Sequence, residues 1–161
     1  MSGLTGDWKK AGVTLQRLVS FMNKEAKQAL RDDGEFIRQA IVSHIDNQDL
    51  SWKPLSEGTI RLKKGNNNIY IETGTLKNCI VVRGVKSKTN GSTIFVGANP
   101  WTIHTPSGLK ASTLLNYLEK GTSRIPPRPL IEPTWKELEP QLKQKWRSRI
   151  KAGIGDIKRR S

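Results

Sequence analysis

The residues best suited to covalent or metal chemistry are few in this chain. It holds one cysteine, Cys79, and two histidines, His44 and His104. A lone cysteine forms neither an internal disulfide nor a multi-thiolate metal site, and no HxH, HExxH or HxxxH spacing pairs the histidines for zinc. A Cys79–His104 dyad stays open as an alternative, although no activating motif accompanies it. Cys79 begins an apolar run, where a buried structural cysteine is typical.

Carboxylates and phosphate-binding loops give no stronger signal for catalysis. Glu132, Glu137 and Glu139 stand where a helix is expected to begin, and the helix dipole favours acids there. Neither GxxxxGK[ST] nor GxGxxG occurs in the sequence. We therefore expect a protein that is not an enzyme and that needs no cofactor or metal.

Positive charge is the most pronounced feature of the composition. The 161 residues include 28 Lys or Arg against 14 Asp or Glu, a formal net charge of +14. Such a balance favours an acidic partner, which is nucleic acid, an anionic surface or acidic protein. The excess concentrates in segment 141–161, where Asp156 is the one acid and the bases are Lys143, Lys145, Arg147, Arg149, Lys151, Lys158, Arg159 and Arg160.

This basic segment has two interpretations. In the first, the segment binds phosphates without reading bases, which would give a strongly salt-dependent affinity for nucleic acid. In the second, it is a solvated helix face. Trp146 lies within an apolar helical stripe, so we expect it to pack rather than to stack on bases. No zinc finger, RNA-recognition motif or helix-turn-helix pattern is evident.

The remaining composition indicates a soluble domain that is assembled in the cytoplasm. Hydrophobic residues make up 35% of the chain, which is lean but sufficient for a core. No run of about 18 apolar residues is present, and the start of the chain, residues 1–7, lacks the pattern of a secretion signal.

Hydrophobic spacing predicts two long helices. From Thr14 to about Gln48, apolar residues recur every three or four positions, with a kink or break expected at Asp32–Gly34. A second stripe, Trp135 to Ile150, predicts a C-terminal helix that Pro140 should bend or delay.

Between these helices, the pattern predicts a small antiparallel sheet. The β-rich runs Cys79–Val85 and Thr93–Gly97 flank the turn signal Thr89–Gly91 and indicate a hairpin. Thr113–Lys120 is expected to be a short helix that ends at Gly121, and Gly74 is expected in a tight turn with positive φ.

These elements predict a single α+β domain over residues 1–161. We expect a flexible arm at 1–13, a core at 14–152 and a basic tail at 153–161. Ile125–Pro133 is stiffened by four prolines and should hold an extended shape. This segment is either an interface, since a stiff segment costs little entropy to order, or a cover for the core.

Three segments, taken in order, resemble a known family. They are Trp52–Ser56, Glu72–Ile80, and Tyr117–Thr122 followed by Pro126–Pro133. They are similar to the neck and tail-completion proteins of tailed bacteriophages, also called head–tail joining or virion morphogenesis proteins. That pattern runs W-x-P-L, then D-T-G-x-L-x-x-S-I, a β-hairpin, E-x-G-T, and A-R-P-F before the last helix. The chain departs from it at Glu72, Cys79, Lys120, Pro127 and Leu130.

The resemblance implies a non-enzymatic structural protein of the virion, located at the head–tail junction and assembled in the host cytoplasm. It implies a homo-oligomeric ring, six-fold or twelve-fold, that caps the tail and contacts neck or connector and tail-tube proteins, with no membrane partner. The basic residues then face either packaged DNA, without sequence specificity, or acidic neighbours. Contacts between subunits or with the neck are expected at Arg124, Pro126, Pro127, Arg128 and Trp101.

A rival hypothesis comes from a different class of protein. The charge also suits a basic nucleic-acid-binding protein, such as a phage regulator or a DNA-packaging accessory. Sequence-selective binding near physiological salt would favour this rival, whereas weak, non-selective binding that fades with salt is compatible with the neck protein.

Overall fold

The computed structural model describes residues 8–72, 74–85, 92–103 and 108–160. Its architecture combines a long N-terminal helix, an antiparallel sheet and a C-terminal helix, which confirms the predicted α+β class. The elements in chain order are α1 (Trp8–Asn47), α2 (Glu57–Leu62), α3 (Thr75–Asn78), β1 (Ile80–Val85), β2 (Thr93–Ala98), α4 (Ala111–Lys120) and α5 (Ile131–Arg160).

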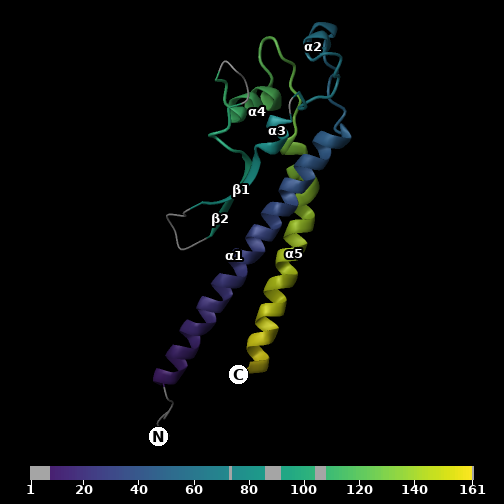
Figure 1. Ribbon diagram of the computed structural model, residues 1–161. Helices are drawn as coiled ribbons and strands as arrows, with labels where there is room; N and C mark the ends of the chain where they lie inside the picture. Colours follow the sequence, from purple (N-terminus) through teal and green to yellow (C-terminus); the bar gives the residue numbers. More distant parts are fainter. Residues whose placement is uncertain (1–7, 73, 86–91, 104–107, 161) are drawn as a thin grey trace, which may run out of the picture.

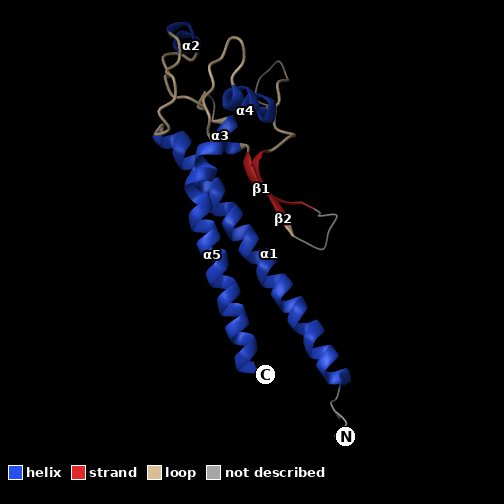
Figure 2. Ribbon diagram, turned by 180° about the vertical axis from the view of Figure 1, so that it is seen from behind, coloured by secondary structure: helices blue, strands red, loops and turns tan. Residues whose placement is uncertain are grey.

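The molecule consists of a head and a two-helix leg (Figure 1). The head holds α2, α3, α4 and the upper part of the sheet, while α1 runs up to it and α5 runs down from it. The two long helices contact each other near the head and diverge toward their free ends (Figure 2). The start of α1 and the end of α5 therefore lie far from the head, on the same side of the molecule.

The first helix is longer and more regular than its sequence predicts. It continues through Asp32–Gly34, where a kink was expected, because Asp33 is bound by α5 and Gly34 fits against the sheet. A Cβ atom added at Gly34 would lie 2.6 Å from Ile94 Cδ1 and 2.7 Å from Val82 Cγ1. Glycine therefore lets α1 cross the sheet closely.

The helices also replace most of the expected arm and tail. α1 begins at Trp8, so residues 8–13 are helical, consistent with the helix-favouring Lys9, Lys10 and Ala11. α5 extends to Arg160, so residues 153–160 continue the helix instead of forming a tail. The rest of the expected arm, residues 1–7, and Ser161 lie outside the described residues.

The sheet confirms the predicted antiparallel pairing. Ile80 pairs with Ala98 at one end of the ladder and Val85 with Thr93 at the other. The turn signal Thr89–Gly91 lies outside the described residues. β1 and β2 both pack against α1, which places the sheet on one side of the leg.

Two glycines lie at helix ends with the positive φ or capping role that the sequence predicts. Gly121 closes α4 with a φ of 75°, and its N–H donates to the Tyr117 carbonyl. Gly74, with a φ of 77°, precedes the single turn of α3. α5 begins at Ile131 and passes continuously through Pro140, so the expected delay is wrong. Pro133 lies in the first turn, where a helix does not need its N–H.

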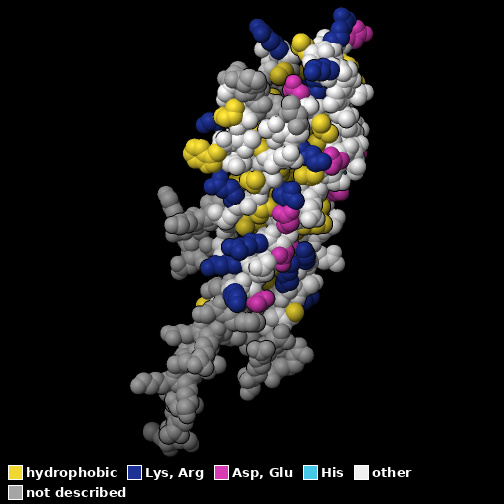
Figure 3. All heavy atoms as spheres, in the orientation of Figure 1, with side chains coloured by type: hydrophobic (Ala, Val, Ile, Leu, Met, Phe, Trp, Pro, Cys, Tyr) yellow, Lys and Arg dark blue, Asp and Glu magenta, His cyan; other side chains and the backbone are white. Residues whose placement is uncertain are grey.

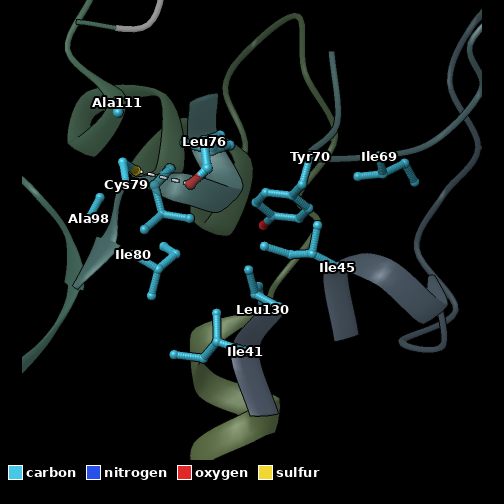
Figure 4. Close-up of a cluster of buried hydrophobic side chains, with 11 residues drawn as sticks. Ile41, Ile45, Ile69, Tyr70, Leu76, Cys79, Ile80, Ala98, Ala111 and Leu130 are labelled. Atoms are coloured by element: carbon cyan, nitrogen blue, oxygen red, sulfur yellow. Dashed lines mark hydrogen bonds between the residues drawn. The ribbon is translucent and has the colours of Figure 1, made fainter. Parts of the chain in front are cut away.

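The hydrophobic core lies where the head meets the leg. Ile41 and Ile45 of α1 point toward Tyr70, Leu130 and Ile80 (Figure 4). Burying one such aliphatic side chain stabilises the fold by about 1.5–3 kcal/mol. The start of α5 is therefore built into the same core as the C-terminal half of α1.

The close crossing at Gly34 yields a stability prediction. Gly34→Leu should lower the free energy of unfolding by about 1–3 kcal/mol, because the added side chain overpacks the contact with Ile94 and Val82. Gly153→Leu is the matched control, since a Cβ there meets nothing within 4 Å and the better helix former should add roughly 0.5–1 kcal/mol. Urea unfolding followed by circular dichroism measures both, and equal effects would contradict the crossing.

Candidate assembly and nucleic-acid interface

The strap, defined from here as Thr122–Leu130, is bonded to the head along its backbone. The Arg128 N–H donates to the Leu118 carbonyl at 2.6 Å, and the Trp52 indole N–H donates to the Pro129 carbonyl at 2.6 Å. The Tyr70 hydroxyl donates to the Arg128 carbonyl. Burial raises the pKa of the Tyr70 phenol well above its ordinary value, which keeps that hydroxyl a donor.

Arg128 holds the strap through its side chain as well. The residue is 4% exposed, and its guanidinium donates to the carbonyls of Lys53 at 2.9 Å and Pro54 at 3.2 Å. Burial lowers the pKa of Arg128 from its ordinary value, although a guanidinium stays charged in proteins. The Arg128 side chain is therefore engaged within its own chain, and its expected place at a subunit interface stays a prediction.

Glu119 connects α4 to the start of α5. Its carboxylate accepts the backbone N–H groups of Leu130 at 2.7 Å, Ile131 at 3.1 Å and Glu132 at 3.0 Å. The first N–H groups of a helix have no partner within the helix, and the helix dipole favours an anion there. Glu119 therefore acts as an N-terminal cap that comes from a different helix.

Together these four residues, Trp52, Tyr70, Glu119 and Arg128, form a unit that we name the lock. They come from three regions of the sequence that carry or adjoin the family-like motifs. The lock fixes where α5 begins and how it leaves the head (Figure 1).

The predicted basic residues of α5 divide into two groups. Lys145 Nζ and Arg149 Nη1 each lie 2.7 Å from a carboxylate oxygen of Asp33 on α1. Asp33 is only 3% exposed, so its charge requires these partners. These two cations connect α5 to α1, although the Lys145 side chain stays 45% exposed, and Lys145 Nζ lies 5.5 Å from the centre of the Phe36 ring.

The second group lies on the outside of the leg. Lys143, Arg147 and Lys151 are exposed, and Lys143 Nζ lies 2.9 Å from a carboxylate oxygen of Glu139. Figure 3 shows Lys and Arg side chains over the described part of the leg, interspersed with Asp and Glu, and others on the head. The remaining predicted bases, Lys158, Arg159 and Arg160, have side chains outside the described set.

The expected interface residues outside the lock lie on two parts of the head. Arg124 and Pro127 are exposed and Pro126 is half-buried, all on the strap. Trp101 is 76% exposed in the turn after β2, where its backbone N–H donates to the Asn99 side-chain oxygen at 3.2 Å. An exposed indole on a hydrogen-bonded turn is typical of an interface anchor.

A cavity of about 510 Å³ lies under the strap. Its lining is largely apolar, with Lys53, Lys63 and Arg124 among the polar residues. Burial lowers the pKa of Lys63, whose ammonium donates to the Asn68 carbonyl. The described lining contains neither histidine nor cysteine, so a cysteine–histidine pair is not among the residues that line this cavity. Its apolar side chains include Leu55, Ile69, Leu76, Leu114, Leu118 and Ile125.

Cys79 and His44, two of the residues considered for catalysis, are bonded to neighbouring groups within the fold. Cys79 is 3% exposed and its thiol donates to the Leu76 carbonyl at 3.0 Å (Figure 4). Burial raises the pKa of this thiol, which disfavours the nucleophilic thiolate. The His44 ring lies 2.7 Å from Asp49 and 3.2 Å from Glu137, and so joins α1 to α5. His104 lies outside the described residues.

In the described part of the chain, no three His, Cys, Asp or Glu residues cluster closely enough to hold a metal ion. None of its helices combines the length and apolar character needed to cross a bilayer. Comparisons of the sequence and structure with protein-family models, curated proteins and solved structures found no match.

The Asp33 ion pairs yield a second stability prediction. Asp33→Asn should lower the free energy of unfolding by about 1.5–3 kcal/mol, because charge-assisted hydrogen bonds to Lys145 and Arg149 are lost. Asp32→Asn is the control on the exposed side, and it should change stability by less than about 0.5 kcal/mol. Chemical unfolding at one fixed salt concentration compares the two variants. A similar small change in both would mean that Asp33 does not hold the helices together.

Proposed function

We propose that this chain is a non-enzymatic structural protein of a tailed bacteriophage, acting at the head–tail junction. It serves as one subunit of a ring, six-fold or twelve-fold, that completes the tail and joins it to the DNA-filled head. The lock is the observation that supports this most. The first and third of the segments that resemble neck and tail-completion proteins are joined by hydrogen bonds in the head of the molecule, and Tyr70, which precedes the second segment, bonds to the same strap.

The distribution of exposed residues supports assembly into a ring. Closing a ring requires two different, complementary patches on each subunit. The β2–α4 connection, which carries Trp101, and α2 lie on opposite sides of the head (Figures 1 and 2). The strap residue Arg124 lines the same cavity as Thr59 of α2. Trp101 and the strap therefore offer two distinct contact regions.

The direct test removes the protein from the infection. A stop codon at Leu15 in the parent phage should give lysates in which DNA-filled heads and separate tails accumulate, as seen by electron microscopy. Supplying the intact gene in trans should restore infectious particles. Normal infectious particles from the mutant phage would overturn the proposal.

The same phage tests the role of Trp101. Complementation with Trp101→Ala should lower the titre at least about tenfold, because an anchoring Trp contributes about 2 kcal/mol or more to an interface. Leu62→Ala is the matched control, since Leu62 is 85% exposed on α2 and apolar. Both variants should keep the circular dichroism spectrum and unfolding midpoint of the parent. A full titre with Trp101→Ala would remove this residue from the interface.

A further inference from the structure

α5 carries two rows of cations on opposite faces. Lys145 and Arg149 face α1 and bind Asp33. Lys143, Arg147 and Lys151 recur at four-residue spacing, which aligns them on one face of a helix. That face is turned about 160° from the Asp33-binding side, at about 100° per residue. This face of α5 therefore points away from α1, and all three residues are exposed.

The outer row carries more charge than its neighbours neutralise. Nearer the head, each cation on this face has an acid one turn before it: Lys136 pairs with Glu132 at 2.6 Å and Lys143 with Glu139 at 2.9 Å. The series of pairs ends at Lys143. Among the residues whose side chains the structure describes, Arg147 and Lys151 have no ion-pair partner.

The residues around this row suit phosphate better than a protein surface. Its exposed neighbours are Gln144 and Ser148, which also hydrogen-bond phosphate oxygens in protein–DNA complexes. Ile150 borders the row as a single exposed aliphatic side chain, whereas protein interfaces are built around an apolar core. The nearby Trp146 ring lies 5.3 Å from the Arg149 guanidinium, on the inner side, so no base-stacking surface accompanies the row.

We propose that the outer face of α5, made of Lys143, Gln144, Arg147, Ser148 and Lys151, binds the phosphate backbone of duplex DNA without reading its sequence. The row is about 12 Å long at 1.5 Å per residue, over which one DNA strand presents roughly three to four phosphates. This deepens the proposed function by naming what the leg contacts, and it rests on that function only for the source of the DNA.

The test measures DNA binding by the full-length protein at several salt concentrations. The probe is a fluorescein-labelled 24-base-pair duplex of arbitrary sequence, followed by anisotropy between 50 and 300 mM NaCl. The test variant is the triple change Lys143→Gln, Arg147→Gln and Lys151→Gln. The control variant removes the same charge from exposed positions on the head, with Arg61→Gln, Lys64→Gln and Lys120→Gln.

The α5 variant should bind at least about tenfold more weakly, and the control should change less than about threefold. The slope of log affinity against log salt should also fall by about 2–3 for the α5 variant, since each phosphate contact contributes about 0.9. Two duplexes of unrelated sequence should bind alike. Equal losses in both variants, or no binding at 50 mM NaCl, would overturn the proposal.

Two more outcomes separate this proposal from its alternatives. If polyglutamate bound more tightly than the duplex and needed the same three residues, the face would belong to an acidic protein partner and the DNA proposal would fail. If the stop-codon phage made separate heads and tails while the protein bound no DNA, the proposed function would stand and this inference alone would fail. Intact phage together with α5-dependent DNA binding would give the reverse result.

Discussion

The rest of the structure depends on the hydrogen bonds by which the lock holds the strap. Burying polar groups is costly unless they are bonded, and Arg128, Tyr70 and Glu119 each satisfy backbone groups that the fold buries or leaves without helix partners. Because these bonds set the start of α5, they also place Leu130 in the core and bring Lys145 and Arg149 to Asp33. The sheet packs against α1.

The orientation in which the lock holds α5 determines which of its positive charges are available to partners. A net charge of +14 describes the chain as a whole, but α5 is oriented so that part of its positive charge neutralises Asp33 and part faces outward. The cations that bind Asp33 stabilise the subunit, whereas the outward-facing cations are available to an anionic ligand. The proposed function and the proposed DNA contact therefore share a single structural origin, the fixed departure of α5 from the head.

The sequence predicts the elements better than it predicts their partners. Periodicity locates both long helices and the antiparallel strands, and Gly121 marks a helix end by local chemistry alone. Asp32–Gly34 resembles a helix break locally, yet contacts with α5 and the sheet keep α1 continuous. The cap from Glu119 joins groups 11–13 residues apart across the strap, so no helix-start motif reveals it. Likewise, the apolar stripe of α5 predicts which face packs inward, but the ion pairs of Lys145 and Arg149 with Asp33 are seen only in the structure.

The central claim is that the lock, through Glu119, holds the start of α5 in place. Native-state amide hydrogen exchange tests it directly, because the first N–H groups of a helix exchange rapidly unless something else binds them. The amides of Leu130, Ile131 and Glu132 should exchange as slowly as those of buried Ile41 and Ile45, and Glu119→Gln should selectively accelerate the first three. Rapid exchange of these three amides in the unchanged protein, while the core stays protected, would contradict the account.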